Sequence, residues 1–227
     1  RLGYSEAEEL SEEDRDWFKL NPSFLMDLFI MDSDGSNVKR LTSKEGYDGG
    51  PFFDAGGKNI CWRRFNREGD QAEIFTMELA GKKERQLTDL GAMSWAPYFH
   101  PSGDYLIFAT NLNGFANFEL YLVDAAGEKE PVRVTWVDGF DGLPAFSPDG
   151  NRLSWTSKRS GLSGSQIFLA QWNHEGALAL LAEAPIRGAA PDSPDSQELE
   201  PSPEALQGLT STNAKVDKDD LRHHIED

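Results

Sequence analysis

The chain has 227 residues, of which 38% are hydrophobic and 11% aromatic, enough to build a sizeable core. Its 39 Asp and Glu outnumber its 22 Lys and Arg, and the formal net charge of −17 argues against nucleic acid or an anionic membrane as a partner. No apolar run reaches the ~20 residues that a membrane-spanning helix needs. The single cysteine, Cys61, excludes an internal disulfide and any multi-cysteine metal site.

Both ends of the chain are acidic, whereas its middle is nearly balanced in charge. Residues 1–27 are predicted to be an acidic insertion within a truncated blade, with a helical tendency over residues 5–16. Residues 28–183 hold a sequence repeat. Residues 184–215 combine prolines with Ser, Asp and Glu, which is the composition of an extended, solvated linker. Residues 216–227 predict a short helix that begins a following domain.

The repeat has a spacing of 46 and then 47 residues. Four kinds of marker keep this spacing: a threonine, a proline, a glycine and an aromatic residue. Regular spacing of this kind predicts a repeat architecture, in which each copy is one supersecondary unit that packs on its neighbours. The markers are Thr42, Thr88 and Thr135; Pro51, Pro97 and Pro144; Gly57, Gly103 and Gly150; and Trp62, Phe108 and Trp155.

Each copy of the repeat predicts four short antiparallel strands. Residues 147–150, Ser-Pro-Asp-Gly, are typical of a tight turn, and Glu119–Asp124 shows the two-residue alternation of a strand. The last strand of each copy ends in Leu-Thr or Val-Thr. No stretch within residues 28–182 predicts a helix of about ten or more residues. Four antiparallel strands per repeat are typical of a β-propeller blade, so the predicted fold class is all-β.

The repeats resemble those of TolB-like six-bladed β-propellers, the PD40 type of WD40-like repeat. The resemblance rests on residues 145–150 (Ala-Phe-Ser-Pro-Asp-Gly), on the alternating third strand and on the Leu-Thr ending. It implies a partial propeller of about three and a half blades, lacking roughly two and a half upstream blades of the ring. The alternative is that half-rings associate into a closed ring. The expected full blades cover residues 47–88, 93–135 and 140–182, after two outer strands within residues 27–42.

The end of the chain carries a second resemblance. Residues 216–226 resemble the first helix of a family of zinc-dependent aminopeptidases, some of which carry a TolB-like propeller ahead of the catalytic domain. The resemblance implies a propeller that binds protein or peptide, or gates substrate access, in a periplasmic or secreted hydrolase. Any zinc would belong to the attached domain, and no cofactor is predicted for this chain. Two alternatives remain: a stand-alone TolB-type cell-envelope interaction protein, and the propeller of a prolyl-oligopeptidase-type serine peptidase.

No catalytic constellation and no metal-ligand set is predicted in the chain, but one repeated position suggests a binding site. Asp48, Ser94 and Asp141 each stand three residues before the proline of their repeat. Equivalent residues of successive blades would ring the mouth of a central channel, beside Tyr47 and Phe140. Two carboxylates there can bind a cation or the basic end of a peptide. The alternative is that Asp48 and Asp141 cap turns by accepting backbone N–H bonds.

Tryptophans and histidines outside the repeat pattern give weaker predictions. Trp95 and Trp136 have no counterparts in the other copies and are candidates for an exposed contact surface. His100 is predicted to be a turn residue, and His174 to lie beside a turn with no partner nearby in the sequence. Three mid-strand aromatic residues are predicted in the core between blades: Trp62, Phe108 and Trp155.

Overall fold

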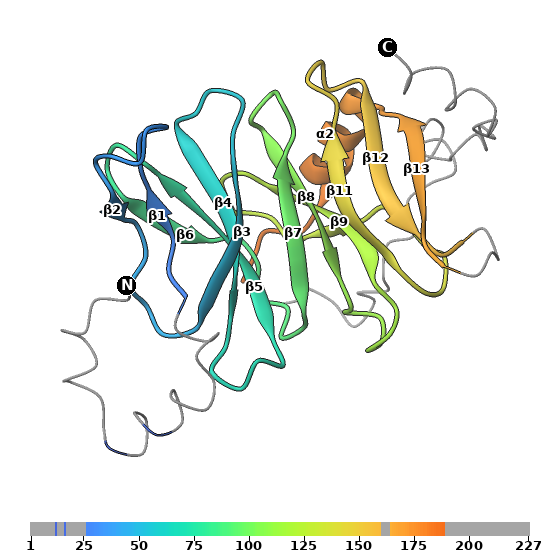
Figure 1. Ribbon diagram of the computed structural model, residues 1–227. Coiled ribbons are helices and arrows are strands. Elements are labelled where there is room, and N and C mark those ends of the chain that lie inside the picture. The colour runs from blue at the N-terminus through green and yellow to red at the C-terminus, as the bar shows by residue number, and fades with distance from the viewer. Residues whose placement is uncertain (1–11, 13–15, 17–25, 160–163, 189–227) are drawn as a thin grey trace, which may run out of the picture.

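The computed structural model describes residues 12, 16, 26–159 and 164–188 (Figure 1). Most of the predicted insertion and linker, and all of residues 216–227, lie outside this part; within the insertion, Glu12 and Asp16 are described and are helical. The described strands and helix are β1 (Phe29–Ile30), β2 (Lys39–Arg40), β3 (Tyr47–Phe53), β4 (Asn59–Phe65), β5 (Ala72–Glu78), β6 (Lys83–Gln86), β7 (Ser94–Phe99), β8 (Tyr105–Thr110), β9 (Glu119–Asp124), β10 (Val132–Arg133), β11 (Asp141–Phe146), β12 (Arg152–Ser157), β13 (Gln166–Gln171) and α2 (His174–Glu183).

The strands form separate antiparallel sheets that stand side by side (Figure 1). The first unit is the four-stranded sheet β3-β4-β5-β6, and the second unit is the four-stranded sheet β7-β8-β9-β10. The third unit contains the three strands β11-β12-β13 and α2, and β1 pairs with β2 ahead of the first unit. The predicted all-β fold, a partial propeller, is confirmed. Within the described residues, no helix combines the length and hydropathy that crossing a bilayer requires.

The repeated Leu-Thr ending has a structural function, because its threonine ties the outermost strand to the strand before it. In each case the threonine hydroxyl oxygen accepts a hydrogen bond from the backbone N–H at the start of that earlier strand. The Thr88 hydroxyl also donates to Glu73 at 2.5 Å. The same side-chain bond therefore recurs with the repeat. It joins the amides of Leu28, Ile74 and Leu120 to Thr42, Thr88 and Thr135 at 2.9, 2.8 and 2.8 Å.

The core consists of apolar layers between neighbouring sheets. Phe108 and Leu106 pack with Cys61 and Ile74 between the first and second units. A larger layer lies between the second unit and the third unit with its helix. The prediction for the mid-strand aromatic residues is confirmed, since the exposed fractions of Trp62, Phe108 and Trp155 are 0%, 0% and 3%.

The third unit differs from the prediction, because residues 174–183 form a helix where a fourth strand was expected. Ala and Leu alternate over residues 177–180, which mimics the two-residue period of a strand, yet both residue types favour helix. Asn173 caps the helix, its side-chain oxygen accepting the Gly176 N–H at 2.9 Å. The helix buries Ala177 and Leu181 in the layer between the second and third units.

After the helix, the chain returns to the second unit. The Glu130 N–H donates to the Pro185 carbonyl at 2.9 Å, and the Arg187 N–H donates to the Glu128 carbonyl at 2.8 Å. The Arg187 guanidinium also reaches the Gln86 carbonyl of the first unit at 2.8 Å. Among the described residues, β13 therefore has no fourth strand beside it.

An aromatic stack joins the start of α2 to the second unit. The rings of His100 and His174 lie parallel with centroids 4.4 Å apart, and His100 also stacks on Tyr105 at 4.7 Å. The Tyr105 hydroxyl accepts from the Trp172 indole N–H at 2.7 Å and lies 3.1 Å from Nδ1 of His174. His100 does lie in the predicted turn, but His174 finds its partners 69 and more residues away in sequence.

Candidate functional site

The three predicted channel residues occupy equivalent places at the start of the inner strands β3, β7 and β11. Asp48 pairs in register with Arg64, Ser94 with Thr110, and Asp141 with Ser157 on the second strand of each unit. The three residues therefore hold equivalent places in their sheets, and the channel-mouth binding site stays a prediction. All three side chains are buried, with residue exposures of 2%, 0% and 1%.

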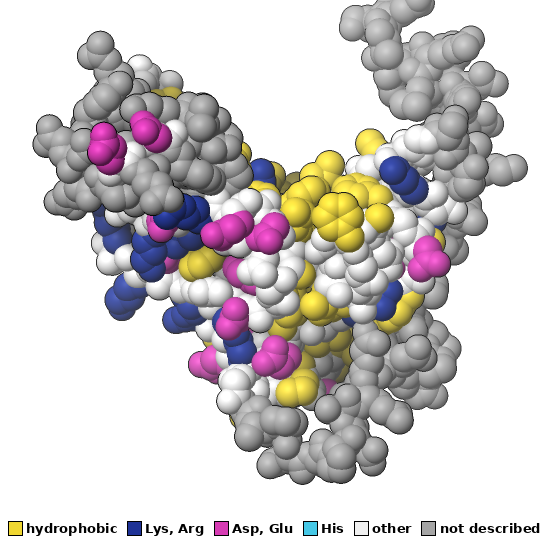
Figure 2. Space-filling model, turned by 90° about the horizontal axis from the view of Figure 1, so that it is seen from below, with side chains coloured by type: hydrophobic (Ala, Val, Ile, Leu, Met, Phe, Trp, Pro, Cys, Tyr) yellow, Lys and Arg dark blue, Asp and Glu magenta, His cyan; other side chains and the backbone are white. Residues whose placement is uncertain are grey.

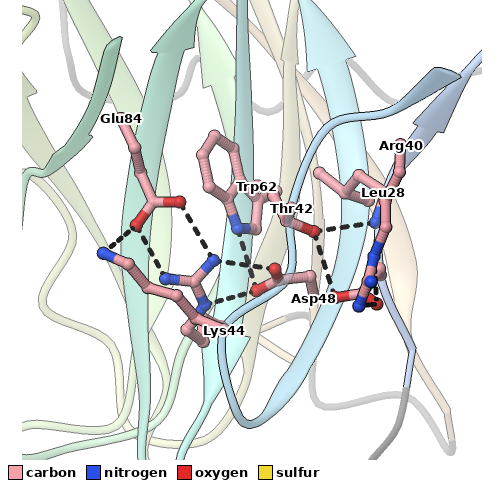
Figure 3. A network of polar contacts seen from close by, with 9 residues as sticks. Leu28, Arg40, Thr42, Lys44, Asp48, Trp62 and Glu84 are labelled. Carbon is pink, nitrogen blue, oxygen red and sulfur yellow. Dashed lines mark hydrogen bonds and ion pairs between the residues drawn. The ribbon is translucent and has the colours of Figure 1, made fainter. Parts of the chain in front are cut away.

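Asp48 forms a buried ion pair (Figure 3). The Arg64 guanidinium donates to its carboxylate through Nε and Nη2 at 2.7 and 2.8 Å, and the Trp62 indole N–H donates at 3.0 Å. Arg64 also donates to Glu84 at 2.8 Å, and Lys44 reaches Glu84 at 2.7 Å. Burial alone would lower the pKa of Arg64, but its bonds to Asp48 and Glu84 raise that pKa above its ordinary value. Asp48 thus fastens β3 to β4.

Asp141 has an arginine partner in a different place. Its carboxylate accepts from Arg159, which also donates to the Ser157 hydroxyl at 3.0 Å and lies over the Trp155 ring at 5.1 Å. Two buried atoms of this group, Asp141 Oδ1 and Trp155 Nε1, have no hydrogen-bond partner among the described residues. The first and third units therefore pair a buried acid with an arginine.

The second unit has a neutral pair at the same position. The Ser94 hydroxyl lies 3.3 Å from the Thr110 hydroxyl, with no charge on either side chain. In the first and third units the buried acid at this position is paired with an arginine, and in the second unit the buried serine is paired with a threonine. This pattern is expected because burying an unpaired charge costs free energy. The bonds of Asp48 and Asp141 run to side chains rather than to turn amides. As the structure stands, neither carboxylate is presented to a ligand.

The aromatic residues beside these positions lie close against glycines of the inner strands. The rings of Tyr47 and Phe140 pass so close to Gly49 and Gly142 that a Cβ there would lie 2.7 and 2.5 Å from ring atoms. Both rings remain partly exposed. Of the five predicted channel residues, Tyr47 and Phe140 are therefore the two that are not buried.

The two predicted contact tryptophans have different environments. Trp95 is partly buried and stacks on Phe118 with centroids 4.6 Å apart, and its indole nitrogen is buried. Trp136 is 36% exposed, beside Arg133 at 5.9 Å. The structure therefore exposes Trp136 as expected and places Trp95 largely in the core.

Arg63, which the sequence analysis does not single out, is the cation at the start of the inner strands. Its guanidinium lies over the rings of Tyr47 and Phe65, at 5.5 and 5.8 Å. Nη1 comes within 2.4 Å of where a Cβ on Gly50 would be, so a side chain at residue 50 would require the guanidinium to move. The sequence repeat could have singled out Arg63, because the equivalent residues of the other two units are uncharged, Ala109 and Thr156.

The inner strands also bulge beside this arginine. In each unit the residue before the repeat proline has a positive φ and lies at a shift in strand register. These residues are Gly50, Ala96 and Leu143, with φ of 64°, 47° and 55°. For Ala96 and Leu143 this left-handed backbone is strained, which is common at binding sites.

Exposed apolar side chains accompany these bulges. Phe52 is 45% exposed with its ring 5.1 Å from that of Tyr98, and Leu143 is 61% exposed. Figure 2 shows the end of the molecule where the inner strands begin, with hydrophobic side chains gathered near the middle and acidic ones beside them. We use the name inner-strand mouth for a set of residues on and beside the inner strands. The set begins with Tyr47 and Phe140 at the start of these strands, continues with Gly50 and Leu143 at the bulges and Arg63 on β4, and ends with Phe52 and Tyr98.

The inner-strand mouth holds aromatic, aliphatic and cationic groups, which suit binding better than bond-breaking chemistry. Among the described residues, no group of three or more His, Cys, Asp or Glu side chains is placed to hold a metal ion.

Comparison with known proteins supports the fold. The family model described as PD40, TolB beta propeller domain, matches residues 19–199. A protein TolB homolog from Chlorobium chlorochromatii is 30% identical over 142 residues, which cover 63% of this chain and 31% of that protein. The Tol-Pal system protein TolB of Helicobacter hepaticus is 27% identical over 158 residues, covering 68% and 37%.

A solved structure gives the same result. The crystal structure of TolB from Acinetobacter baumannii aligns with a TM-score of 0.58 at 26% identity, over 68% of this chain and 37% of that one. The chain thus spans about a third of the length of the TolB proteins it matches here.

Proposed function

Because the chain belongs to the PD40 family of TolB β-propeller domains, we propose that it is a non-catalytic module that binds a peptide or protein segment at the inner-strand mouth. The observation that carries this function is the exposed apolar surface of the inner strands, where Phe52 packs on the Tyr98 ring and Leu143 is 61% exposed. Exposed apolar clusters on a soluble domain commonly mark interaction sites.

Binding is tested with a short peptide that carries an aromatic side chain. Titration of the full-length protein with N-acetyl-Phe-Gln amide, followed by calorimetry, is expected to give saturable binding. Phe52→Ser should weaken this binding several-fold, because the substitution removes the phenyl ring against which the peptide's aromatic side chain would pack. If no saturable binding is found up to millimolar peptide, the inner-strand mouth does not have this function.

We further propose that the propeller is the accessory region of a periplasmic or secreted zinc-dependent aminopeptidase. The support is the resemblance of residues 216–226 to the first helix of that family, after an acidic Pro-rich segment. These residues lie outside the described part of the chain. Any catalytic groups and zinc would belong to the attached domain.

Activity of the full-length protein on aminoacyl-nitroanilides tests this role. We expect cleavage that a zinc chelator abolishes and added zinc restores, because a zinc-bound water would be the nucleophile. Chelator-resistant cleavage sensitive to a serine-hydrolase reagent would favour the prolyl-oligopeptidase alternative. Absence of cleavage would favour a stand-alone TolB-type envelope protein, which similarity to proteins named TolB also supports.

A further inference from the structure

We propose that Arg63 binds the carboxylate of an acidic peptide ligand, which inserts an apolar side chain beside it at the inner-strand mouth. This inference rests on the proposed peptide-binding function and specifies its ligand. It also reverses the charge predicted from the sequence, where Asp48 and Asp141 suggested a cationic ligand.

The first argument is how the charges at this end of the inner strands are paired. Arg64 and Arg159 are held by the buried carboxylates of Asp48 and Asp141. Arg63 has no ion pair or hydrogen bond with any described residue, and it contacts aromatic rings instead. Of these three arginines, Arg63 is thus the one with its charge available to a ligand.

The second argument is the chemistry of the Arg63 guanidinium. Its Cζ lies 5.5 and 5.8 Å from the ring centroids of Tyr47 and Phe65, so two aromatic rings flank the cation. These rings offer no carboxylate, and none of the described residues accepts a hydrogen bond from the N–H donors of Arg63. A carboxylate accepts two such bonds in the fork geometry that arginine provides and a lysine ammonium does not.

The third argument is the glycine beside Arg63 in the inner strand. Gly50 adds no side chain beside Arg63 Nη1, which lies 2.4 Å from where a Cβ at residue 50 would be. In the second and third units a side chain stands in place of this glycine, Ala96 and Leu143. The first unit is therefore the one described unit in which an arginine lies against a glycine at the bulge.

The fourth argument is the apolar surface next to the cation. Phe52, two residues along β3 from Gly50, pairs with Tyr98 at 5.1 Å and is 45% exposed. The chain's net charge of −17 repels free anions, so one arginine alone would hold them weakly. A ligand that combines a carboxylate with a neighbouring aromatic or aliphatic group fits both features.

The test compares two peptides of equal size, N-acetyl-Phe-Glu amide and N-acetyl-Phe-Gln amide, titrated into the full-length protein at low salt. We expect the Glu peptide to bind about tenfold more tightly, the size of a charge-assisted hydrogen-bonded pair at a partly buried site. Arg63→Gln should remove this preference, and Arg63→Lys should restore only part of it. Arg85→Gln, the same charge change on β6, should leave the preference unchanged.

The outcomes separate the two proposals. Equal binding of both peptides, or a Glu preference that persists in Arg63→Gln, would overturn the inference and leave the proposed peptide-binding function standing. Absence of binding by either peptide would overturn both. Thermal unfolding of Arg63→Gln and Arg63→Lys shows whether each variant is folded, so a folding defect is not mistaken for lost recognition.

Discussion

Replacing Arg64 by alanine is expected to destabilise the protein by about 3–5 kcal/mol, because it leaves the buried Asp48 carboxylate without its cation. Asp48 is 2% exposed and receives two bonds from Arg64. The Trp62 indole is then its remaining described partner, since Lys44 stays with Glu84. Urea unfolding of the parent protein and of Arg64→Ala measures the loss in free energy of unfolding, provided that the free energy falls with urea concentration at the same slope in both proteins.

The second unit supplies a matched control for this prediction. The double variant Asp48→Ser with Arg64→Thr copies the Ser94–Thr110 pair of the equivalent position. Since the buried carboxylate and its cation are then both removed, we expect it to recover most of the stability lost in Arg64→Ala, apart from the bonds that Trp62 and Glu84 lose. A double variant as unstable as the sum of its single changes would contradict the view that the acid and arginine are needed only for each other.

Stability is expected to fall as the pH drops below about 6.5, the ordinary pKa of histidine. Burial lowers the pKa of His100, and neighbouring His174 lowers it further, against the opposing effects of the Gly150 carbonyl and Asp104. The unfolded chain therefore takes up a proton at a pH where the folded protein resists it. Stability is full above the unfolded pKa and declines below it, by at most about 1.4 kcal/mol per pH unit for one proton.

The pH effect is measured by urea unfolding between about pH 8 and pH 5. The other ionisable groups that face His100 or its stacking partners are His174, Tyr105, Asp104 and Glu175. His100→Ser, which copies Ser147 of the third unit, is expected to flatten the decline in this range. An unchanged slope in His100→Ser would show that the decline has another source.

The sequence predicts the parts of the fold that depend on local residue types. The spacing of Thr42, Thr88 and Thr135 marks the sheet units because each hydroxyl makes the same bond. The glycines of the tight turns recur for a similar reason, since Gly57, Gly103 and Gly150 all have positive φ.

Features set by tertiary contacts were not predictable in the same way. A strand is expected in place of α2 because the repeat period extends the third blade to residue 182, whereas burial of Ala177 and Leu181 against the second unit favours a helix. Arg159 stands two residues beyond the position of Arg64 in the repeat, so alignment does not reveal it as the partner of Asp141. Arg63 gains its role only through a bulge at Gly50 and two rings.

An acidic peptide is expected to bind at the inner-strand mouth through Arg63. A crystal structure of the full-length protein with N-acetyl-Phe-Glu amide is the most direct test of this binding. We predict that the glutamate carboxylate lies within hydrogen-bonding distance of the Arg63 guanidinium, over Gly50, with the phenyl ring against Phe52 and Tyr98. A peptide bound elsewhere, for example at the exposed Trp136, with Arg63 free of it, would contradict this mode of binding.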